Sequence, residues 1–406
     1  MDGCRARRFT GAGWIAAVWL ACSVSAGFAQ LPPGEPISFP NRLTLILTNT
    51  LDLPRTGEPV SLPLDRILGK APDFNRSFFR LKGVPKLCMH NLGCRHPAVG
   101  FEPLDIPSQI VRVPGEGERE ELVFQVDLAP RERKTVVLQY NPRGSNLPAY
   151  PPKTQVFEKW YTDGTNIAWE SEVIAYRSYS GLVDYFGKSY PHLRLQDLPP
   201  DSYHHEAAWG VDPFVIGKKP GLCGIALVAG DGFTPCWGAG DSLAFTHRGF
   251  GGGPVCAGAI VSVAKGGRPL LDEYYTIHAG RCENVVRTVA HRKGVLIAPG
   301  MQKNEGDMMQ LDEKRGFIVS HARVGEYGTI GMALVFRPGD YAGVVDRAEG
   351  RFIKLKPGPD GSVSYLSMGV WYRVSAEQPA SMEALVKTVE HMALCFRNPV
   401  TVEIVK

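Results

Sequence analysis

The chain has 406 residues, of which 44% are hydrophobic and 21% charged, and its formal net charge is +4. A chain of this length and apolar content can bury one or more large cores. The nearly balanced charge gives no reason to expect nucleic acid as a partner, although a local basic patch could still bind an acidic glycan.

The first 29 residues have the pattern of a signal peptide. Basic residues within Arg5–Arg8 precede the apolar run Trp14–Ala21, and Gly27–Ala29 offers a small-x-small cleavage site before Gln30. We therefore expect export to the periplasm or the extracellular space, and removing this leader lowers the formal charge from +4 to about +2. Lipid attachment at Cys22 is a weaker alternative, because the tryptophan three residues before it fits a lipoprotein motif badly. No later apolar run approaches the length of a membrane span, so we expect no transmembrane segment.

Seven of the nine cysteines follow the leader, and this odd number leaves at least one thiol unpaired. Cys88 and Cys94 are close enough in sequence for a local disulfide. With His90 and His96 they also form a C-x-H-x3-C-x-H pattern, which matches no standard zinc module. We therefore expect a disulfide-stapled loop here in preference to a metal site.

Residues 38–145 are predicted to form an N-terminal β-sandwich of immunoglobulin-like character. Leu43–Thr48, Leu122–Val126 and Thr135–Tyr140 are short alternating or apolar runs with turn residues between them. We expect the second and third runs to pair as antiparallel strands through a proline-containing turn. The proline-rich residues 141–152 are then interpreted as a linker.

Residues 153–406 contain about a dozen short strand-like runs separated by glycine-containing turns, which is too many for a simple sandwich. One helix is predicted near the end, with Ser381 as its N-cap and Leu385, Val386 and Val389 on one face. The predicted fold class is therefore all-β: an immunoglobulin-like β-sandwich, a large β-supersandwich and one C-terminal helix.

Residues 166–217 combine aromatic rings with arginine, histidine and carboxylate side chains, a mixture that is usually kept where a polar ligand binds. If Trp169–Tyr179 is a single strand, alternation places Trp169, Arg177 and Tyr179 on one face. This arrangement would suit a sugar carboxylate held by the guanidinium while an aromatic ring stacks on the pyranose. The alternative is a salt bridge between sheets, with ordinary tyrosines at the strand rim.

The opposite face of the same predicted strand carries Glu170, Glu172 and Tyr176. The two glutamates are two positions apart, roughly 6.6 Å along a strand. This spacing does not fix the separation of their carboxylates, so retaining and inverting hydrolysis both remain open. Tyr176 is a candidate base if a nearby cation lowers its pKa.

A predicted loop carries Tyr203, His204 and His205, followed by Trp209 and Asp212. Two imidazoles offer acid and base groups near neutral pH, and Asp212 could orient one of them. Alternatively, one imidazole is solvated, the other packs on Trp209, and Asp212 caps the following turn.

His321 and Arg323 share a face at the end of another predicted strand and are weaker candidates for the same cleft. The alternative is that both are ordinary solvated residues at a strand end. The sequence contains neither a G-x-S-x-G nor an H-E-x-x-H motif.

The runs W-E-S-E-V-I-A-Y-R and Y-H, followed by G-V-D and I-G, resemble a secreted bacterial domain-of-unknown-function family, number 4861. Its members tend to be encoded among polysaccharide-utilisation genes, and its pattern has W-E-N-D with A-[YF]-R, then Y-H with G-x-D and a later V-G. The matching residues are Trp169, Glu170, Ala175, Tyr176, Arg177, Tyr203, His204, Gly210, Asp212 and Gly217. The resemblance covers most of the chain after the leader and implies a galactose-mutarotase-like supersandwich, a fold that hosts epimerases, lyases and hydrolase domains.

The chain departs from the family pattern at two places. Ser171 and Glu172 replace an Asn-Asp pair, and Ala207, Ala208 and Trp209 stand where relatives carry His, Gly and an acidic residue. These departures leave room for a different specificity.

The first functional hypothesis is a lyase that cleaves uronate-containing oligosaccharides or polysaccharides by β-elimination. Arg177 would neutralise the sugar carboxylate, and His204 or Tyr176 would remove the C5 proton. One alternative is a glycoside hydrolase that uses Glu170 or Glu172 with Asp212. Another is a glycan-binding protein without catalytic activity.

The candidate catalytic residues are therefore Tyr176, Arg177, His204, Glu172 and Asp212. The candidate substrate-binding residues are Trp169, Glu170, Tyr179, Tyr203, His205, Trp209, His321 and Arg323. We expect an acidic oligosaccharide or polysaccharide as partner, no nucleic acid and no cofactor, and a bound divalent cation stays open.

Overall fold

The computed structural model describes residues 37–84, 105–114, 119–145, 147–158, 166–198, 203–238, 242–372 and 381–406. The predicted signal peptide and the predicted Cys88–Cys94 disulfide lie outside these residues. The five described cysteines are all free and buried. No helix in the described part of the chain has the length and apolar character needed to cross a bilayer.

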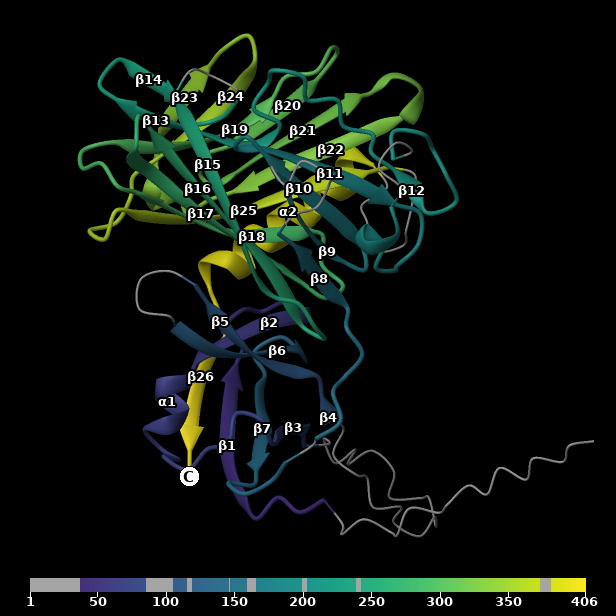
Figure 1. The fold of residues 1–406 in the computed structure, drawn as a ribbon, viewed down its shortest axis with the longest axis vertical. Coiled ribbons are helices and arrows are strands. Elements are labelled where there is room, and N and C mark those ends of the chain that lie inside the picture. Colours follow the sequence, from purple (N-terminus) through teal and green to yellow (C-terminus); the bar gives the residue numbers. More distant parts are fainter. Residues whose placement is uncertain are drawn as a thin grey trace, which may run out of the picture. The chain divides into compact units, whose positions relative to one another are not determined.

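Two antiparallel sheets form the N-terminal sandwich (Figure 1). The first sheet consists, in spatial order, of β26 (Thr401–Val405), β1 (Asn41–Thr48), β7 (Arg133–Tyr140), β3 (Phe79–Gly83) and β4 (Asp105–Ile106). The second consists of β2 (Arg55–Pro63), β6 (Arg119–Leu128) and β5 (Ser108–Val113), and the short helix α1 (Leu64–Leu68) follows β2. Leu45, Leu62, Phe124 and Leu138 are fully buried between the two sheets.

The predicted pairing of β6 with β7 is wrong. β6 pairs with β2 and β5, whereas β7 pairs with β1 and β3 in the other sheet. Both strands alternate strongly, and their apolar faces carry Phe124 on β6 and Leu138 on β7. These faces bury each other when the strands lie in opposite sheets, so the turn at Pro130 crosses from one sheet to the other.

The last strand of the chain also lies in the first sheet. β26 pairs antiparallel with β1, with Val405 opposite Thr44 and Thr401 opposite Thr48. The sequence analysis had grouped this strand with the second unit, because nothing local in a five-residue strand identifies its partner.

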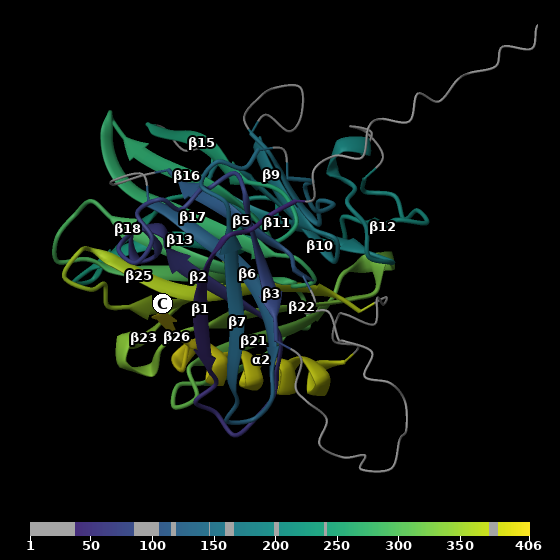
Figure 2. The ribbon, with the colours of Figure 1, turned by 90° about the horizontal axis from the view of Figure 1, so that it is seen from below.

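The larger part of the chain forms two layers of sheet (Figures 1 and 2). One layer is an eight-stranded sheet of β15 (Leu243–Gly251), β16 (Cys256–Lys265), β17 (Arg268–His278), β18 (Glu283–Ala290), β25 (Ser362–Trp371), β22 (Thr329–Val335), β21 (Phe317–Arg323) and β20 (Met308–Asp312). The opposing layer begins with β12 (Gly210–Val211), β11 (Leu182–Lys188), β10 (Ile174–Tyr179), β9 (Asn166–Ser171) and β8 (Thr154–Phe157). A separate sheet in the same layer consists of β14 (Gly232–Pro235), β13 (Leu222–Ala229), β19 (Leu296–Gln302), β24 (Gly350–Leu355) and β23 (Tyr341–Asp346).

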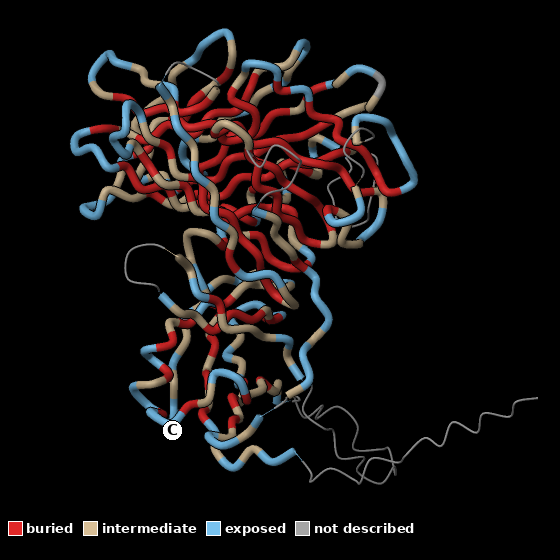
Figure 3. The backbone as a smooth tube through the Cα atoms, in the orientation of Figure 1, coloured by how far each residue is buried: buried red, intermediate tan, exposed pale blue. Residues whose placement is uncertain are grey.

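The core between these layers is aromatic at its centre. Trp169, Tyr176 and Tyr185 project from β9–β11 and meet Tyr275 and Tyr365 of the eight-stranded sheet, all fully buried. The Trp169 and Tyr275 ring centroids are 5.0 Å apart. Figure 3 shows that buried residues run along the strands of both layers, whereas exposed residues collect in the connecting loops.

The C-terminal helix α2 (Met382–Arg397) packs against β21 and β22. The Ser381 side chain accepts a hydrogen bond from the Ala384 amide at 3.1 Å, as its predicted N-cap role requires. Leu385 and Val389 are fully buried against the sheet. The all-β fold class with one C-terminal helix is confirmed.

Candidate functional site

The segment predicted as a single strand, Trp169–Tyr179, is a hairpin. β9 and β10 pair antiparallel, with Glu170 opposite Ala175 and Trp169 opposite Tyr176, and the chain turns at Glu172 and Val173. Cross-strand partners share a face of the sheet, so Trp169 and Tyr176 face the core together. Arg177 and Glu170 lie on the other face, which corrects the predicted alternation.

A second hairpin places an acid beside Arg177. β10 and β11 pair across Ser180 and Gly181, whose φ values of 49° and 69° are those of a type I′ turn. This register sets Arg177 directly opposite Asp184. The two side chains therefore emerge next to each other on the face that is turned away from the core.

The guanidinium of Arg177 lies at the centre of the site, and its side chain is 9% exposed. Its Nη2 is 2.5 Å from Asp184 Oδ2 and 3.7 Å from Asp212 Oδ2, and its Nη1 donates a hydrogen bond to the Tyr203 hydroxyl at 3.2 Å. The Tyr179 and Tyr203 ring centroids are 4.7 and 5.2 Å from Cζ. These ion pairs and ring contacts fix the position of the guanidinium.

Asp184 and Asp212 are buried, and both approach the same Nη2 of Arg177. Burial raises the pKa of both carboxyls, although Arg177 opposes this, and the neighbouring Asp184 carboxylate raises the pKa of Asp212 further. The pair therefore keeps a proton under conditions in which exposed carboxylates have lost theirs.

His204 is the exposed member of the cluster, with a side chain that is 55% exposed. Its Nδ1 is 3.5 Å from Asp212 Oδ2, and its carbonyl accepts a hydrogen bond from the Tyr327 hydroxyl at 2.5 Å. Burial, and secondarily the charge of Arg177, lowers the pKa of His204. The imidazole is therefore neutral at neutral pH, and a ring nitrogen that carries no proton can accept one.

Gly210 explains how Asp212 reaches the site. Its φ is +138°, and a Cβ at this position would lie 1.9 Å from the Gly187 carbonyl oxygen, so only glycine allows β12 to pair closely with β11. Two residues later, the Asp212 amide donates to the Tyr203 carbonyl at 2.8 Å. Asp212 Oδ1 accepts from the Phe214 amide at 3.1 Å, which holds the carboxyl beneath His204.

The cluster around Arg177 opens onto a pocket of about 410 Å³, whose lining includes His204 but not Asp212. Arg177, Asp184 and Tyr179 line it from β10 and β11, and Asn166 lines it from β9. Residues 214–217 form a further wall, where buried Gln302 donates its Nε2 to the Val215 carbonyl at 3.1 Å. The pocket thus combines a fixed cation, a neutral base, hydroxyl groups and aromatic faces.

The sequence profile of one family, described as a domain of unknown function (DUF4861), matches residues 47–402. The chain belongs to this family. The resemblance inferred from the sequence motifs is therefore confirmed.

Among solved structures, the chain is similar to a glycosyl hydrolase family 38 protein from Enterococcus faecalis at 10% identity, with a TM-score of 0.49, covering 90% of this chain and 47% of that one. It is also similar to an alpha-mannosidase from Enterococcus faecalis V583 at 9% identity, with a TM-score of 0.46, covering 90% of this chain and 46% of that one. The chain spans about half the length of both proteins. A comparison with curated proteins found no match.

Two of the motif residues shared with the family are core residues. The Trp169 Nε1 donates to Asn284 Oδ1 at 2.8 Å. The Tyr176 hydroxyl donates to the Cys282 carbonyl at 2.5 Å and accepts from the Gly369 amide at 3.0 Å, and burial raises its pKa well above the ordinary range. The structure therefore does not bring Trp169 or Tyr176 to the pocket.

Glu170 belongs to a buried ion pair with Lys188. Its Oε1 also accepts from the amides of Arg194 and Leu195, both at 2.8 Å, and from the Gln155 side chain. This carboxylate pins residues 194–195 to the sheet and lies outside the lining of the pocket.

Glu172 lies at the turn of the β9–β10 hairpin. Its Oε2 accepts from the Gly280 amide at 2.8 Å, and its Oε1 is 3.5 Å from Lys153 Nζ. These contacts hold the turn, so neither Glu172 nor Glu170 lines the pocket.

Four further candidates lie outside the pocket. Trp209 is buried in a small cluster with Phe186, and His205 is exposed beside His204. His321 packs its ring 5.1 Å from that of Tyr372, and Arg323 is exposed. None of these four candidates lines the pocket.

The sequence analysis missed Asp184, Asn166 and the wall at residues 214–217. A signal for Asp184 was present in the Ser180-Gly181 dipeptide. If these two residues form a hairpin turn, the residues at equal distances on either side of it pair, and Arg177 is then opposite Asp184. No comparable local signal pointed to Asn166.

The divalent cation that the sequence leaves open has no obvious ligand set in the described ranges. Within them, no group of three or more His, Cys, Asp or Glu side chains has a metal-binding arrangement. Asp184 and Asp212 are engaged with Arg177 instead.

Proposed function

We propose that this protein is a carbohydrate-active enzyme that cleaves uronate-containing oligosaccharides or polysaccharides by β-elimination. One observation carries the proposal: a neutral imidazole beside a buried carboxyl lines the same pocket as a fixed guanidinium. Elimination needs these two elements together, since a base must remove a proton whose acidity depends on binding of the neighbouring carboxylate.

The reaction can be assigned to individual side chains. His204 takes the C5 proton, a C4–C5 double bond forms, and the C4–O4 bond breaks. Arg177 donates hydrogen bonds to the sugar carboxylate, which stabilises the negative charge that develops there. Tyr179 returns a proton to the leaving O4, and because burial raises its pKa, the hydroxyl stays protonated until the leaving group accepts the proton.

The geometry gives less support to hydrolysis by paired carboxylates. Retaining glycosidases hold two carboxyl groups about 5 Å apart, and inverting enzymes hold them farther apart, with the scissile bond between them. Asp184 and Asp212 lie 2.5 and 3.7 Å from the same Nη2 of Arg177, and Asp212 does not line the pocket, so the two carboxyls are not placed on either side of a sugar. Glu170 and Glu172 have partners elsewhere.

Glycan binding without turnover is the second candidate. One observation favours it: the charge of Arg177 is already balanced by Asp184 at 2.5 Å, which weakens its pull on a substrate carboxylate. In that case the Tyr179 and Tyr203 rings would act as stacking platforms.

An ultraviolet absorbance assay over pectic, algal and glucuronate-bearing oligosaccharides tests the proposal. We expect an unsaturated-uronate band from the wild-type protein and a rate about 10²-fold lower in Arg177→Lys, because lysine lacks the forked donors of arginine. Arg323→Lys, at an exposed arginine outside the pocket, serves as the matched control and should keep the wild-type rate.

Each of the other outcomes contradicts the lyase. New reducing ends without the absorbance band would indicate hydrolysis. Binding measured by calorimetry without either product would indicate a glycan-binding protein.

The pH dependence gives a separate prediction. The lowered pKa of His204 places its protonation below the ordinary histidine value of 6.5. The neutral form is the base, so kcat/KM should fall as the pH drops through this lowered pKa and should be flat from there to neutral pH. A pH–rate profile with its acid limb above 6.5 would contradict the assignment of His204, with its lowered pKa, as the base.

A further inference from the structure

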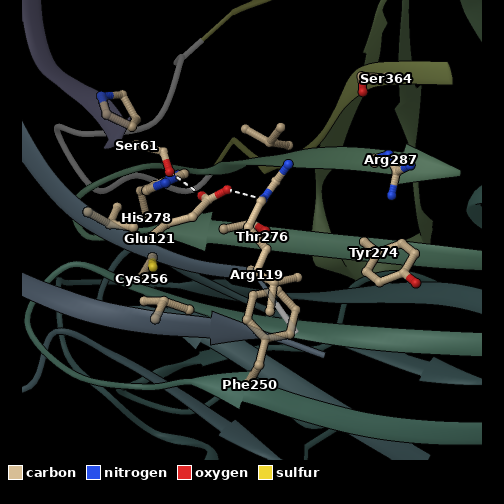
Figure 4. Close-up of a pocket in the computed structure, with 15 residues that line it drawn as sticks. Ser61, Arg119, Glu121, Phe250, Cys256, Tyr274, Thr276, His278, Arg287 and Ser364 are labelled. Atoms are coloured by element: carbon tan, nitrogen blue, oxygen red, sulfur yellow. Dashed lines mark hydrogen bonds and ion pairs between the residues drawn. The ribbon is translucent and has the colours of Figure 1, made fainter. Parts of the chain in front are cut away.

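A second pocket, of about 330 Å³, lies on the outer face of the eight-stranded sheet (Figure 4). Strands β15, β16, β17, β18 and β25 form its floor, and β2, β5 and β6 of the N-terminal sandwich form its roof. It shares no lining residue with the pocket at Arg177. The function proposed above does not involve it.

The strand register aligns the floor into rows of side chains. Tyr274 on β17, Arg287 on β18 and Ser364 on β25 are direct cross-strand partners and form one row. Thr276 and Val285 form the adjacent row. Side chains that are paired in this way point to the same side of the sheet, so polar groups lie beside apolar ones along the floor.

Phe250 belongs to this second row, and its ring lies over the glycine opposite it. Its partner across the strands is Gly258, where a Cβ would lie 2.1 Å from the Phe250 ring. The absence of a side chain at Gly258 lets the ring lie across the sheet and extend toward the pocket. Phe250 is itself buried and provides an aromatic wall.

The roof has an apolar part, and β5 is joined to the floor at one end of the pocket. Val111, Val113 and Val123 face the pocket from β5 and β6. Gln109 accepts hydrogen bonds from the amides of Val255 and Cys256 at 2.9 and 3.1 Å and donates to the Cys256 carbonyl at 3.0 Å. These three hydrogen bonds join β5 to the start of β16 at one end of the pocket.

The two arginines that line the pocket differ in how closely they are paired with an acidic residue. Arg119 is 2.5 Å from Glu121, whose other oxygen accepts from the Ser61 hydroxyl. The guanidinium of Arg287 lies 5.7 Å from the centre of the Tyr274 ring, and its Nη2 is 3.3 Å from Asp360, whose side chain is 59% exposed. An exposed pair of this kind contributes little, so Arg287 can exchange Asp360 for a bound anion at small cost.

His278 lines the same pocket without adding charge. Burial, and secondarily the charge of Arg281, lowers the pKa of His278 to about 3, so its imidazole is neutral at physiological pH. The formal charges in the lining are therefore those of Arg119, Arg287 and Glu121: Arg119 pairs with Glu121, and Arg287 pairs with the exposed Asp360 outside the lining.

We propose that this pocket binds a small carboxylic acid with an apolar body about the size of one ring. The body lies between the roof valines and Phe250, and the carboxylate accepts hydrogen bonds from Arg287 and Ser364. Predominantly apolar pockets with a few convergent polar groups are typical small-molecule sites. The Arg287 guanidinium, on exchanging the exposed Asp360 for the ligand, selects an anion from among apolar molecules of this size.

Benzoate and its uncharged isostere benzamide are suitable probes for the full chain, with binding followed by protein-observed NMR or calorimetry. We expect benzoate to bind saturably and about tenfold more tightly than benzamide, because one charge-assisted hydrogen bond is worth about a factor of ten. Arg287→Gln should remove this preference, and Arg287→Lys should restore part of it. Val285→Phe, which fills the floor, should weaken both probes.

Two matched variants make the experiment decisive. Arg119→Gln should leave the preference for benzoate within about twofold, because Glu121 already engages Arg119. Arg177→Lys should leave it unchanged, because Arg177 lines the other pocket. Equal affinity for the two probes, no saturable binding of either, or the same loss in Arg119→Gln as in Arg287→Gln would overturn the proposal.

Discussion

His204→Ala is expected to lower kcat/KM on uronate oligosaccharides by about 10²- to 10⁴-fold, the usual contribution of a positioned general base. The loss should appear in kcat, since proton removal belongs to the transition state. The side chain is 55% exposed, so the midpoint of thermal unfolding should change little. Initial rates from the ultraviolet assay, together with a thermal melt of the same sample, measure both quantities.

His205→Ala is the matched control for this prediction. His205 is adjacent in sequence and exposed, but it does not line the Arg177 pocket. The control should keep the wild-type kcat. Equal losses in the two variants would show that the loop as a whole matters and that His204 is not the base.

Alternation of apolar residues was sufficient to predict an all-β fold. The buried positions of β1 and β7 follow the period-two pattern that identified them. The partners of the strands were harder to predict. The positions of β6, β7 and β26 depend on which apolar faces pack against each other in the folded protein. That information lies in contacts between segments far apart in the sequence.

The candidate site was predicted in part for a similar reason. Arg177, His204 and Asp212 meet in the structure because they flank tight, glycine-containing turns, which local sequence can indicate. The turn at Glu172 and Val173 has no glycine, proline or asparagine. It is held instead by long-range contacts, including the hydrogen bond from the Gly280 amide to Glu172, so no local signal marks a break in the strand there.

The face of the sheet that carries Arg177 therefore contains two clusters of charged groups. Arg177 and Asp184 line a pocket, with Asp212 buried behind them, whereas Glu170 and Lys188 form a closed pair beneath the loop at residues 194–195. Charged groups that line a pocket are suited to catalysis, and a buried, fully engaged pair supports the surrounding structure. This distinction assigns Glu170 a structural role, which stability measurements can test.

Lys188→Met is expected to lower the free energy of unfolding by about 3–5 kcal/mol, because it leaves the Glu170 carboxylate buried without its cation. Lys188 and Glu170 side chains are 1% and 0% exposed, and Lys188 Nζ also donates to the Ser171 and His192 carbonyls at 2.6 and 2.7 Å. Urea denaturation at neutral pH measures the change.

Lys153→Met is the matched control, since it breaks an ion pair with Glu172 in which Lys153 is 60% exposed. Its cost should stay below about 1 kcal/mol. The double variant Glu170→Gln with Lys188→Met removes both charges, and it should be more stable than Lys188→Met alone. If the double variant were instead the less stable of the two, the loss would come from the hydrogen bonds of Glu170 to the Arg194 and Leu195 amides and not from an uncompensated charge.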